Sequence, residues 1–285
     1  MQRDEPLLVH LLAQLGSNRT AVKNLLKFGA VQVNGAAVRQ FDHALVPGDE
    51  ITVGHLQAAA ATERLQAARI QIVHEDAALL VLDKPSGLLT VATEQNKTDT
   101  LFFRLNQFLS ERDGPRAVRP QVVHRLDQET SGLVMFAKSA ELKQRLQDRW
   151  PEVQKTYWAV VEGMPSPAEG TITNYLTESK ALRVFSSRNP TPDAREATTH
   201  YRTEQTRDGL SLLEIRLETG RKHQIRVHMA DLRTPVAGDV RYGAKSDPCR
   251  RLALHAGRLT FEHPQSGESL TLTSPLPQAF RRLFA

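Results

Sequence analysis

The sequence is poor in cysteine and has no long apolar run. Cys249 is its only cysteine, which excludes an intramolecular disulfide and fits a reducing compartment. No apolar stretch approaches the roughly 18–20 residues that a membrane-spanning helix needs. The first residues carry early acids and lack a small-residue cleavage signal, which argues against a secretory peptide. We therefore expect a cytoplasmic protein with no membrane partner.

The sequence also lacks the ligand spacing of a metal site. His223 and His228 are close in sequence, but no cysteine or acidic residue stands at ligand spacing beside them. We therefore expect no metal.

The chain carries a net positive charge. Its net charge is +5 and its pI is about 9.5, which fits a polyanionic partner without requiring one. Arg19, Lys23 and Lys27 recur every four residues, so a helix would align them on one face. A second basic cluster comprises Lys180, Arg183, Arg188 and Arg195. Each cluster predicts either a phosphate-binding surface or an ordinary solvated face.

We predict three parts: a small module over residues 1–55, a linker over residues 56–69 and a large domain over residues 70–285. The linker is rich in alanine and glutamine and is compatible with a helix. Because the module is too short to build a large core, it is interpreted as an attachment to the large domain.

Within the module, the pattern predicts two helices and a hairpin. Apolar residues at helical spacing predict a helix over residues 7–15, and Ser17 or Asn18 can cap a second helix that ends before Gly29. Alternating valines around Asn34-Gly35 predict a hairpin with a tight primed turn. A short strand over residues 50–53 follows.

The large domain alternates short β-rich runs with a few helices. Ser139 can cap a helix that runs to Trp150. Predicted strands include residues 70–73, 79–82, 133–137, 157–162, 210–218 and 269–273. This order predicts an α+β fold built on one large mixed, mostly antiparallel sheet.

Two segments concentrate the groups that could carry chemistry. The first, HRLDQETSG over residues 124–132, places Asp127 in a polar loop before an apolar strand. Asp127 could also be a loop organiser that accepts hydrogen bonds from backbone amides and from Thr130 or Ser131. The second, ETGRKHQIRVHM over residues 218–229, crowds basic side chains that need an anion nearby, either a phosphate or a buried aspartate. Its basic residues are Arg221, Lys222, His223, Arg226 and His228.

These segments, in this order, resemble the RluA-type pseudouridine synthases over residues 70–285. The resemblance rests on VLDKPSGLLT, HRLDQETSGLVMFAKS, KTYWAVVEG, TTHYR, ETGRKHQIRVHMA, Gly238-Asp239 and LHA at residues 254–256. The N-terminal module resembles the S-four type of RNA-binding module. It matches at Ser17-Asn18-Arg19, Lys23, Leu26, Gly29, Val31, Val33-Asn34-Gly35 and Pro47-Gly48-Asp49.

The resemblance implies an enzyme that isomerises uridine in structured RNA to pseudouridine without a cofactor. Asp127 matches the family's nucleophile, and Arg226 matches the cation that pairs with it. Arg125 matches the residue that replaces the flipped uridine, and Tyr157 matches the aromatic residue that stacks on the base.

The remaining basic residues are expected to contact RNA: Arg19, Lys23, Lys27, Arg221, Lys222 and His223. Lys222 departs from the threonine or serine that is common at its position. Ribosomal RNA is the favoured substrate, transfer RNA is an alternative, and a monomer is expected. Two other interpretations stay open. One is a non-catalytic RNA-binding protein. The other is a hydrolase that uses Asp127 with a histidine such as His223 or His228, although the sequence lacks a nucleophile elbow.

Overall fold

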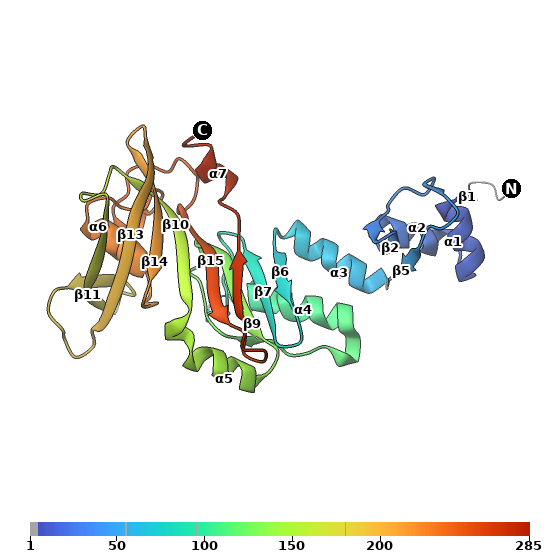
Figure 1. The fold of residues 1–285 in the computed structure, drawn as a ribbon, viewed down its shortest axis with the longest axis horizontal. Coiled ribbons are helices and arrows are strands. Elements are labelled where there is room, and N and C mark those ends of the chain that lie inside the picture. Colours follow the sequence, from blue (N-terminus) through green and yellow to red (C-terminus); the bar gives the residue numbers. More distant parts are fainter. Residues whose placement is uncertain (1–4, 55, 95, 180) are drawn as a thin grey trace. The chain divides into compact units, whose positions relative to one another are not determined.

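The computed structural model describes residues 5–54, 56–94, 96–179 and 181–285 (Figure 1). The chain separates into two compact units. The first runs through Ile70 and also includes residues 104–119, whereas the second comprises residues 71–103 and 120–285. The prediction divided the chain at residues 55 and 70 and did not include residues 104–119 in the first unit.

Local signals in the sequence determine how the first unit begins. The Asn18 side chain accepts a hydrogen bond of 2.9 Å from the backbone N–H of Ala21, so Asn18, one of the two predicted caps, starts the helix. Asn34 and Gly35 have φ values of 51° and 78°, as a primed two-residue turn requires. The elements are β1 (Glu5–Pro6), α1 (Leu7–Leu15), α2 (Arg19–Lys27), β2 (Val31–Val33), β3 (Ala36–Ala37), β4 (Ala44–Leu45) and β5 (Ile51–Val53).

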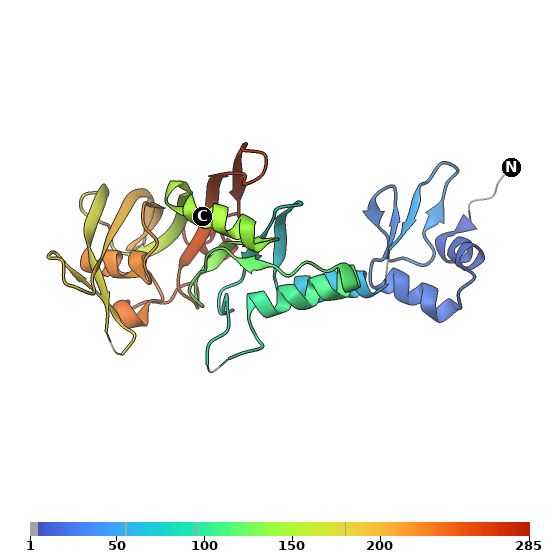
Figure 2. The same ribbon diagram turned by 90° about the horizontal axis from the view of Figure 1, so that it is seen from below.

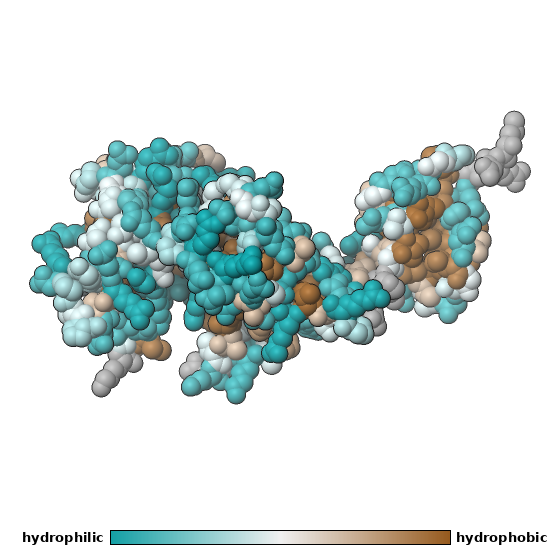
Figure 3. Space-filling view, turned by 60° about the horizontal axis from the view of Figure 1, so that its bottom comes forward, coloured by the Kyte–Doolittle hydropathy of each residue, from teal (hydrophilic) through white to brown (hydrophobic). Residues whose placement is uncertain are grey.

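These elements enclose a small apolar core. Strands β3, β2 and β5 form one sheet in that order, and β1 pairs with β4. Helices α1 and α2 supply Leu7, Leu11 and Leu26, which are almost completely buried. Figure 3 shows a hydrophobic area on the surface of this unit, and Phe41 and Val46 are among its exposed apolar side chains.

The predicted linker is a helix, α3 (Leu56–Ala67), which belongs to the first unit. Ala61 and Leu65 are buried, and Arg64 forms an ion pair with Glu111. Glu111 lies on α4 (Leu101–Asp113), and the two helices lie side by side in Figures 1 and 2. A short 3₁₀ turn, Gly114–Arg116, follows α4.

The second unit is built on one large sheet, and the predicted α+β class is confirmed. Over the described residues, its strands follow the order β12-β11-β13-β14-β10-β15-β9-β7-β6, with β16 paired to β15 and β8 paired to β9. The strands are β6 (Gln71–Glu75), β7 (Leu79–Lys84), β8 (Gln121–Val122), β9 (Ser131–Ala137), β10 (Gln154–Glu162), β11 (Glu169–Glu178), β12 (Val184–Ser187), β13 (Arg195–Arg207), β14 (Leu210–Leu217), β15 (Leu254–Glu262) and β16 (Ser269–Thr273).

Helices and turns complete the second unit: α5 (Ala140–Asp148), α6 (Gln224–Asp231), α7 (Gln278–Arg281) and the 3₁₀ turns Trp150–Glu152 and Val240–Tyr242. The Ser139 hydroxyl accepts a hydrogen bond of 3.2 Å from Leu142 N–H, as predicted for a cap. The α-helix ends at Asp148, two residues before the predicted end, because Pro151 lies inside the following 3₁₀ turn.

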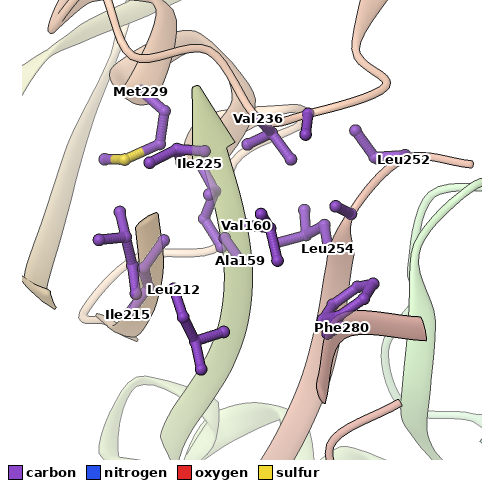
Figure 4. Packing of buried hydrophobic residues seen from close by; sticks show 14 of the residues in the cluster. Ala159, Val160, Leu212, Ile215, Ile225, Met229, Val236, Leu252, Leu254 and Phe280 are labelled. Atoms are coloured by element: carbon purple, nitrogen blue, oxygen red, sulfur yellow. The ribbon is translucent and has the colours of Figure 1, made fainter. Parts of the chain in front are cut away.

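An apolar cluster fixes α6 against the sheet. Ile225 and Met229 of α6 pack with Val160 of β10 and Ile215 of β14 (Figure 4). Figure 4 also places Phe280 of α7 beside Leu254 at the start of β15. Because α6 is held in this way, the side chains on its other faces have fixed positions.

Strands β9 and β15 are parallel, whereas the other strand pairs among the described residues are antiparallel. The two backbones approach so closely that a Cβ atom added at Gly132 would lie 2.2 Å from the carbonyl oxygen of Ala256. Gly132 also has a φ of 113°, which favours glycine. This pairing brings the start of β9 beside the C-terminal part of the chain.

Candidate active site

The loop that carries Asp127 is held on both sides by the last residue of β7 and the segment that follows this strand. The Thr90 hydroxyl accepts a hydrogen bond of 3.1 Å from Leu126 N–H and donates one of 2.9 Å to Leu126 C=O. On the other side, the carbonyl of Gln128 accepts a hydrogen bond of 3.0 Å from the Lys84 ammonium. The backbone of Asp127 is therefore fixed between two anchored neighbours.

Lys84 is the unexpected member of this anchor. Its side chain has no exposed area, and its ammonium also donates to the carbonyls of Pro85 at 3.0 Å and Leu88 at 2.7 Å. Burial lowers the pKa of Lys84 to about 7. The only sequence signal for this role is a lysine directly before a proline at the end of a predicted strand, and this signal alone does not indicate a buried anchor.

A chain of buried polar groups fixes the start of β9. The Ser131 hydroxyl lies 2.8 Å from His255 Nδ1, and His255 Nε2 lies 3.0 Å from the Ser274 hydroxyl. Ser274 donates to Asp83 at 2.5 Å, and Arg251 Nη2 donates to the Ser131 hydroxyl at 2.7 Å. Burial lowers the pKa of His255 to about 4, so the imidazole is neutral near pH 7.

The Asp127 carboxylate faces two side chains of the α6 region. Its Oδ2 atom lies 3.7 Å from Arg226 Nη1 and 3.7 Å from His223 Nε2. Burial raises the pKa of Asp127, and the charges of Arg226 and Arg125 oppose this effect. Asp127 is the carboxylate at the centre of the site.

The alternative role of Asp127 as a loop organiser does not agree with these contacts. Thr130 donates its backbone N–H to the backbone carbonyl of Asp127 at 3.2 Å, and the Ser131 hydroxyl bonds to other groups. Neither hydroxyl is hydrogen-bonded to the Asp127 carboxylate in the described part of the chain. The side chain is therefore left to face the pocket.

Arg226 has the predicted neighbour, but its hydrogen bonds go to a different carboxylate. Its Nε and Nη2 atoms donate to Asp239 at 2.6 and 2.8 Å, and both side chains are almost fully buried. Its guanidinium also lies 5.1 Å from the centre of the Tyr242 ring. A bidentate pair fixes the orientation of a guanidinium, so Asp239 aims the remaining nitrogen at Asp127. From the sequence, Asp239 was identified only as part of the Gly238-Asp239 motif and was given no role.

A pocket of about 230 Å³ opens at Asp127. Tyr157 enters it from β10 and is half-buried. Burial raises the pKa of Tyr157, and the charge of Asp127 raises it further, so the hydroxyl keeps its proton. The structure brings six predicted site residues together here: Arg125, Asp127, Tyr157, Arg221, His223 and Arg226.

Two of the five basic side chains of residues 218–229 are neutral near pH 7, and Arg226 has the buried Asp239 as the nearby carboxylate. His228 is fully buried and bonds to Thr199 Oγ1 at 2.9 Å and Asn174 Oδ1 at 2.8 Å. Burial lowers the pKa of His228, and that of His223, to about 4. His228 is therefore a core histidine and does not face Asp127, which removes it as a partner for hydrolysis.

The other predicted basic residues lie outside this pocket. Lys222 does not line it and forms an ion pair with Glu178. Arg19, Lys23 and Lys27 are exposed on one face of α2 in the first unit. In the second cluster, Arg183, Arg188 and Arg195 are exposed, and Lys180 lies outside the described residues. Among the described residues, no group of histidine, cysteine, aspartate and glutamate side chains could hold a metal ion.

Comparison with known proteins identifies the family. The profile of the RNA pseudouridylate synthase family matches residues 78–231. The uncharacterized RNA pseudouridine synthase YlyB of Bacillus subtilis is 37% identical over 270 residues, covering 93% of this chain and 88% of that protein. The ribosomal large subunit pseudouridine synthase D of Zymomonas mobilis is 33% identical over 294 residues, covering 97% and 91%.

Comparison with solved structures leads to the same family. The structure of human RNA pseudouridylate synthase domain containing 4 matches with a TM-score of 0.64 at 25% identity, covering 80% of this chain and 96% of that one. The chain belongs to the RNA pseudouridylate synthase family. It is a pseudouridine synthase, an enzyme that isomerises uridine in RNA. In the part of the chain that the structure describes, no helix is both long and apolar enough to cross a membrane.

Proposed function

We propose that Asp127 is the catalytic carboxylate and that the pocket receives a single uridine flipped out of structured RNA. The observation that carries this proposal is the Asp127 carboxylate, which is mostly buried and faces the pocket with Arg226 and His223 both 3.7 Å from its Oδ2 atom. The volume of about 230 Å³ lies below the roughly 300–1,000 Å³ of pockets for larger ligands and suits one base.

The reaction needs only the groups that are present. The bond from the sugar to the base nitrogen breaks, the base rotates, and the sugar is rejoined to a base carbon. Nothing is oxidised or reduced and no water is added, so the residues need no cofactor. A carboxylate can act in this step as nucleophile or as base. Attack at the sugar, attack at the base and formation of a glycal all use the same ionised Asp127.

Two residues of the pocket provide for base flipping. Extruding a base costs about a few kcal/mol. Tyr157 stacks on the extruded base, and aromatic stacking contributes roughly 1–3 kcal/mol. Arg125 is exposed at the pocket, two residues before Asp127, and fills the space that the uridine leaves. Arg221 and Lys222 bind the neighbouring phosphates.

Ribosomal RNA is the favoured substrate, and transfer RNA is the alternative. Support comes from relatives named as ribosomal large subunit synthases, among them one from Xanthomonas campestris that is 32% identical over 288 residues. The first unit acts as an S-four-like RNA-binding module, with Arg19, Lys23 and Lys27 toward phosphates. The enzyme acts in the cytoplasm as a monomer.

Substitution of the carboxylate tests the catalytic assignment. Asp127→Asn keeps the size of the side chain but can act neither as nucleophile nor as base. We expect no pseudouridine on uridine-labelled RNA, with RNA affinity close to that of the wild type. Turnover above about one part in a thousand would assign the chemistry to another group.

The target is found by pseudouridine mapping of all stable RNAs from a strain that lacks the protein. Loss of sites in ribosomal RNA supports the favoured substrate, whereas loss confined to transfer RNA replaces it with the alternative.

A further inference from the structure

His223 adopts an unusual backbone conformation beside Asp127. It precedes α6 with φ 53° and ψ 18°, the left-handed region that costs free energy for a residue with a Cβ atom. Its ring is buried and its Nε2 atom lies 3.7 Å from Asp127 Oδ2. Strain of this kind persists only where the surrounding structure maintains it, and it is frequent at functional sites.

The hydrogen bonds around the ring determine where its proton is. The Tyr242 hydroxyl oxygen accepts a hydrogen bond of 3.2 Å from Val184 N–H. The same hydroxyl lies 2.8 Å from His223 Nδ1. Because these are the two hydrogen bonds of the Tyr242 hydroxyl within the described ranges, its proton has His223 Nδ1 as its acceptor. The neutral imidazole then carries its own proton on Nε2, the nitrogen that faces Asp127.

Nearby charges favour the neutral ring. Burial and the adjacent Arg226 guanidinium lower the pKa of His223 to about 4. Arg226 is also stacked over the Tyr242 ring, so tyrosine, arginine and histidine keep one another in place. Asp127 Oδ2 therefore lies between one cation and one neutral N–H donor.

We propose that His223 is a positioning residue for the catalytic carboxylate. Its Nε2–H donates to Asp127 when RNA fills the pocket, and the Tyr242 hydroxyl determines which ring nitrogen carries that proton. The separation of 3.7 Å is longer than a hydrogen bond, and such contacts commonly shorten in the substrate complex. A neutral donor orients the carboxylate without adding a second positive charge that would weaken it as a nucleophile. The proposal gives His223 a different role from a phosphate contact, and it rests on Asp127 being catalytic.

Three substitutions distinguish the effect of the N–H donor of His223 from the effect of the size and shape of its ring. His223→Gln keeps an N–H donor at a similar reach, whereas His223→Leu keeps bulk and loses the donor. Tyr242→Phe keeps the ring under Arg226 and removes only the hydroxyl that fixes the tautomer. His200→Gln, at a partly exposed histidine on β13 that does not line the pocket, is the matched control.

The measurement is the single-turnover rate at saturating RNA, with the RNA dissociation constant determined separately. We expect His223→Leu to slow the saturated rate by about 10- to 100-fold, as loss of a hydrogen bond to a charged group does. His223→Gln should restore most of that rate, and Tyr242→Phe should slow it measurably. The dissociation constants should stay within about threefold of the wild type. An unchanged saturated rate for His223→Leu, or a loss confined to RNA affinity, overturns the proposal.

The tautomer itself gives an independent test. Nitrogen-15 spectra of histidine-labelled protein, assigned by the signals that His223→Gln removes, report which ring nitrogen is protonated. Protonation at Nε2 supports the proposal, and protonation at Nδ1 overturns it. Asp127→Asn separates this inference from the proposed function. If that variant stays active, the catalytic assignment is wrong; if it is inactive while His223→Leu is fully active, only the role of His223 is wrong.

Discussion

Burial and nearby charge act on Asp127 in opposite directions. Burial raises its pKa and is the larger effect, whereas Arg226 and Arg125 lower the pKa. A raised pKa means that the folded chain holds this proton more tightly than the unfolded chain does. The ionised carboxylate therefore costs stability at any pH above the unfolded pKa of about 3.9, and the cost disappears below it.

We therefore predict that Asp127→Asn is at least as stable as the wild type at pH 7. Arg226 keeps Asp239 as its partner, so no buried charge is left unpaired. A gain of 1 kcal/mol would raise the melting temperature by roughly 2–4 °C. Calorimetry at pH 7 and at pH 4 measures the effect, and the difference between the proteins should shrink at the lower pH. A loss of several degrees at pH 7 would show that Asp127 stabilises the fold.

Arg125 gives a second prediction at the residue scale. If it fills the space of the extruded uridine, Arg125→Ala should slow single-turnover conversion most on paired RNA, where unstacking costs about a few kcal/mol. The loss should be smaller on a looped version of the same RNA. Tyr157→Phe serves as the comparison, because it keeps the ring that stacks in either substrate. Equal losses for Arg125→Ala on both RNAs would reduce Arg125 to a phosphate contact.

At the scale of elements, the parallel pairing of β9 and β15 depends on one glycine. Gly132→Ala would put a methyl group 2.2 Å from the Ala256 carbonyl oxygen, so the strands must separate. Gly209→Ala is the matched control, because Gly209 also has a positive φ of 75° but no atom within 4 Å of an added Cβ. We expect Gly132→Ala to lower the melting temperature well beyond the control, which should lose roughly the 1–2 kcal/mol of a left-handed residue. Similar melting temperatures would mean that the pairing adjusts easily.

The basic face of α2 gives a prediction about RNA affinity. Replacing Arg19, Lys23 and Lys27 together with glutamine should make RNA binding less sensitive to salt, because fewer counterions are released. Each lost phosphate contact flattens the slope of log affinity against log salt by roughly 0.7 for a single strand. Turnover of bound RNA should not change. An unchanged slope would identify the face as solvated surface only.

Elements with local signals could be predicted from the sequence, and elements without them could not. The Asn18 cap and the Asn34-Gly35 turn need only their neighbours, and both were predicted correctly. Strands β11 and β13 at the far side of the sheet are largely polar, so hydrophobic alternation does not mark them.

The site shows the same division. The motif resemblance identified Asp127 as the candidate nucleophile. The residues that orient Arg226 and His223 beside it, however, are distant from them in sequence. Asp239 is 13 residues from Arg226, and Tyr242 is 19 residues from His223. Lys84 reaches the carbonyl of Gln128 across 44 residues. Contacts of this kind depend on the folded sheet, and no local pattern encodes them.

For the whole molecule, the place of residues 104–119 in the first unit determines where the chain can be cut. Leu65 of α3 and Phe108 of α4 are buried and line one hollow, and Glu111 pairs with Arg64 of α3. We predict that a fragment of residues 55–285 stays monodisperse, because it keeps α3. A fragment of residues 71–285 should aggregate or melt several degrees lower, since apolar surface of α4 loses its cover. Light scattering and calorimetry on both fragments decide this, and identical behaviour would show that α3 contributes nothing.

The buried polar chain at Ser131 also sets the order of events during synthesis. Ser131 precedes its partner His255 by 124 residues, and Ser274 comes later still. At roughly 5–20 residues per second, a ribosome takes about 6–25 s to make the residues between them. During that interval the nascent chain already carries Asp127 but lacks the strand that anchors the start of β9. The anchor at the start of β9 is thus completed only near the end of translation, and a polypeptide released before Ser274 would lack it.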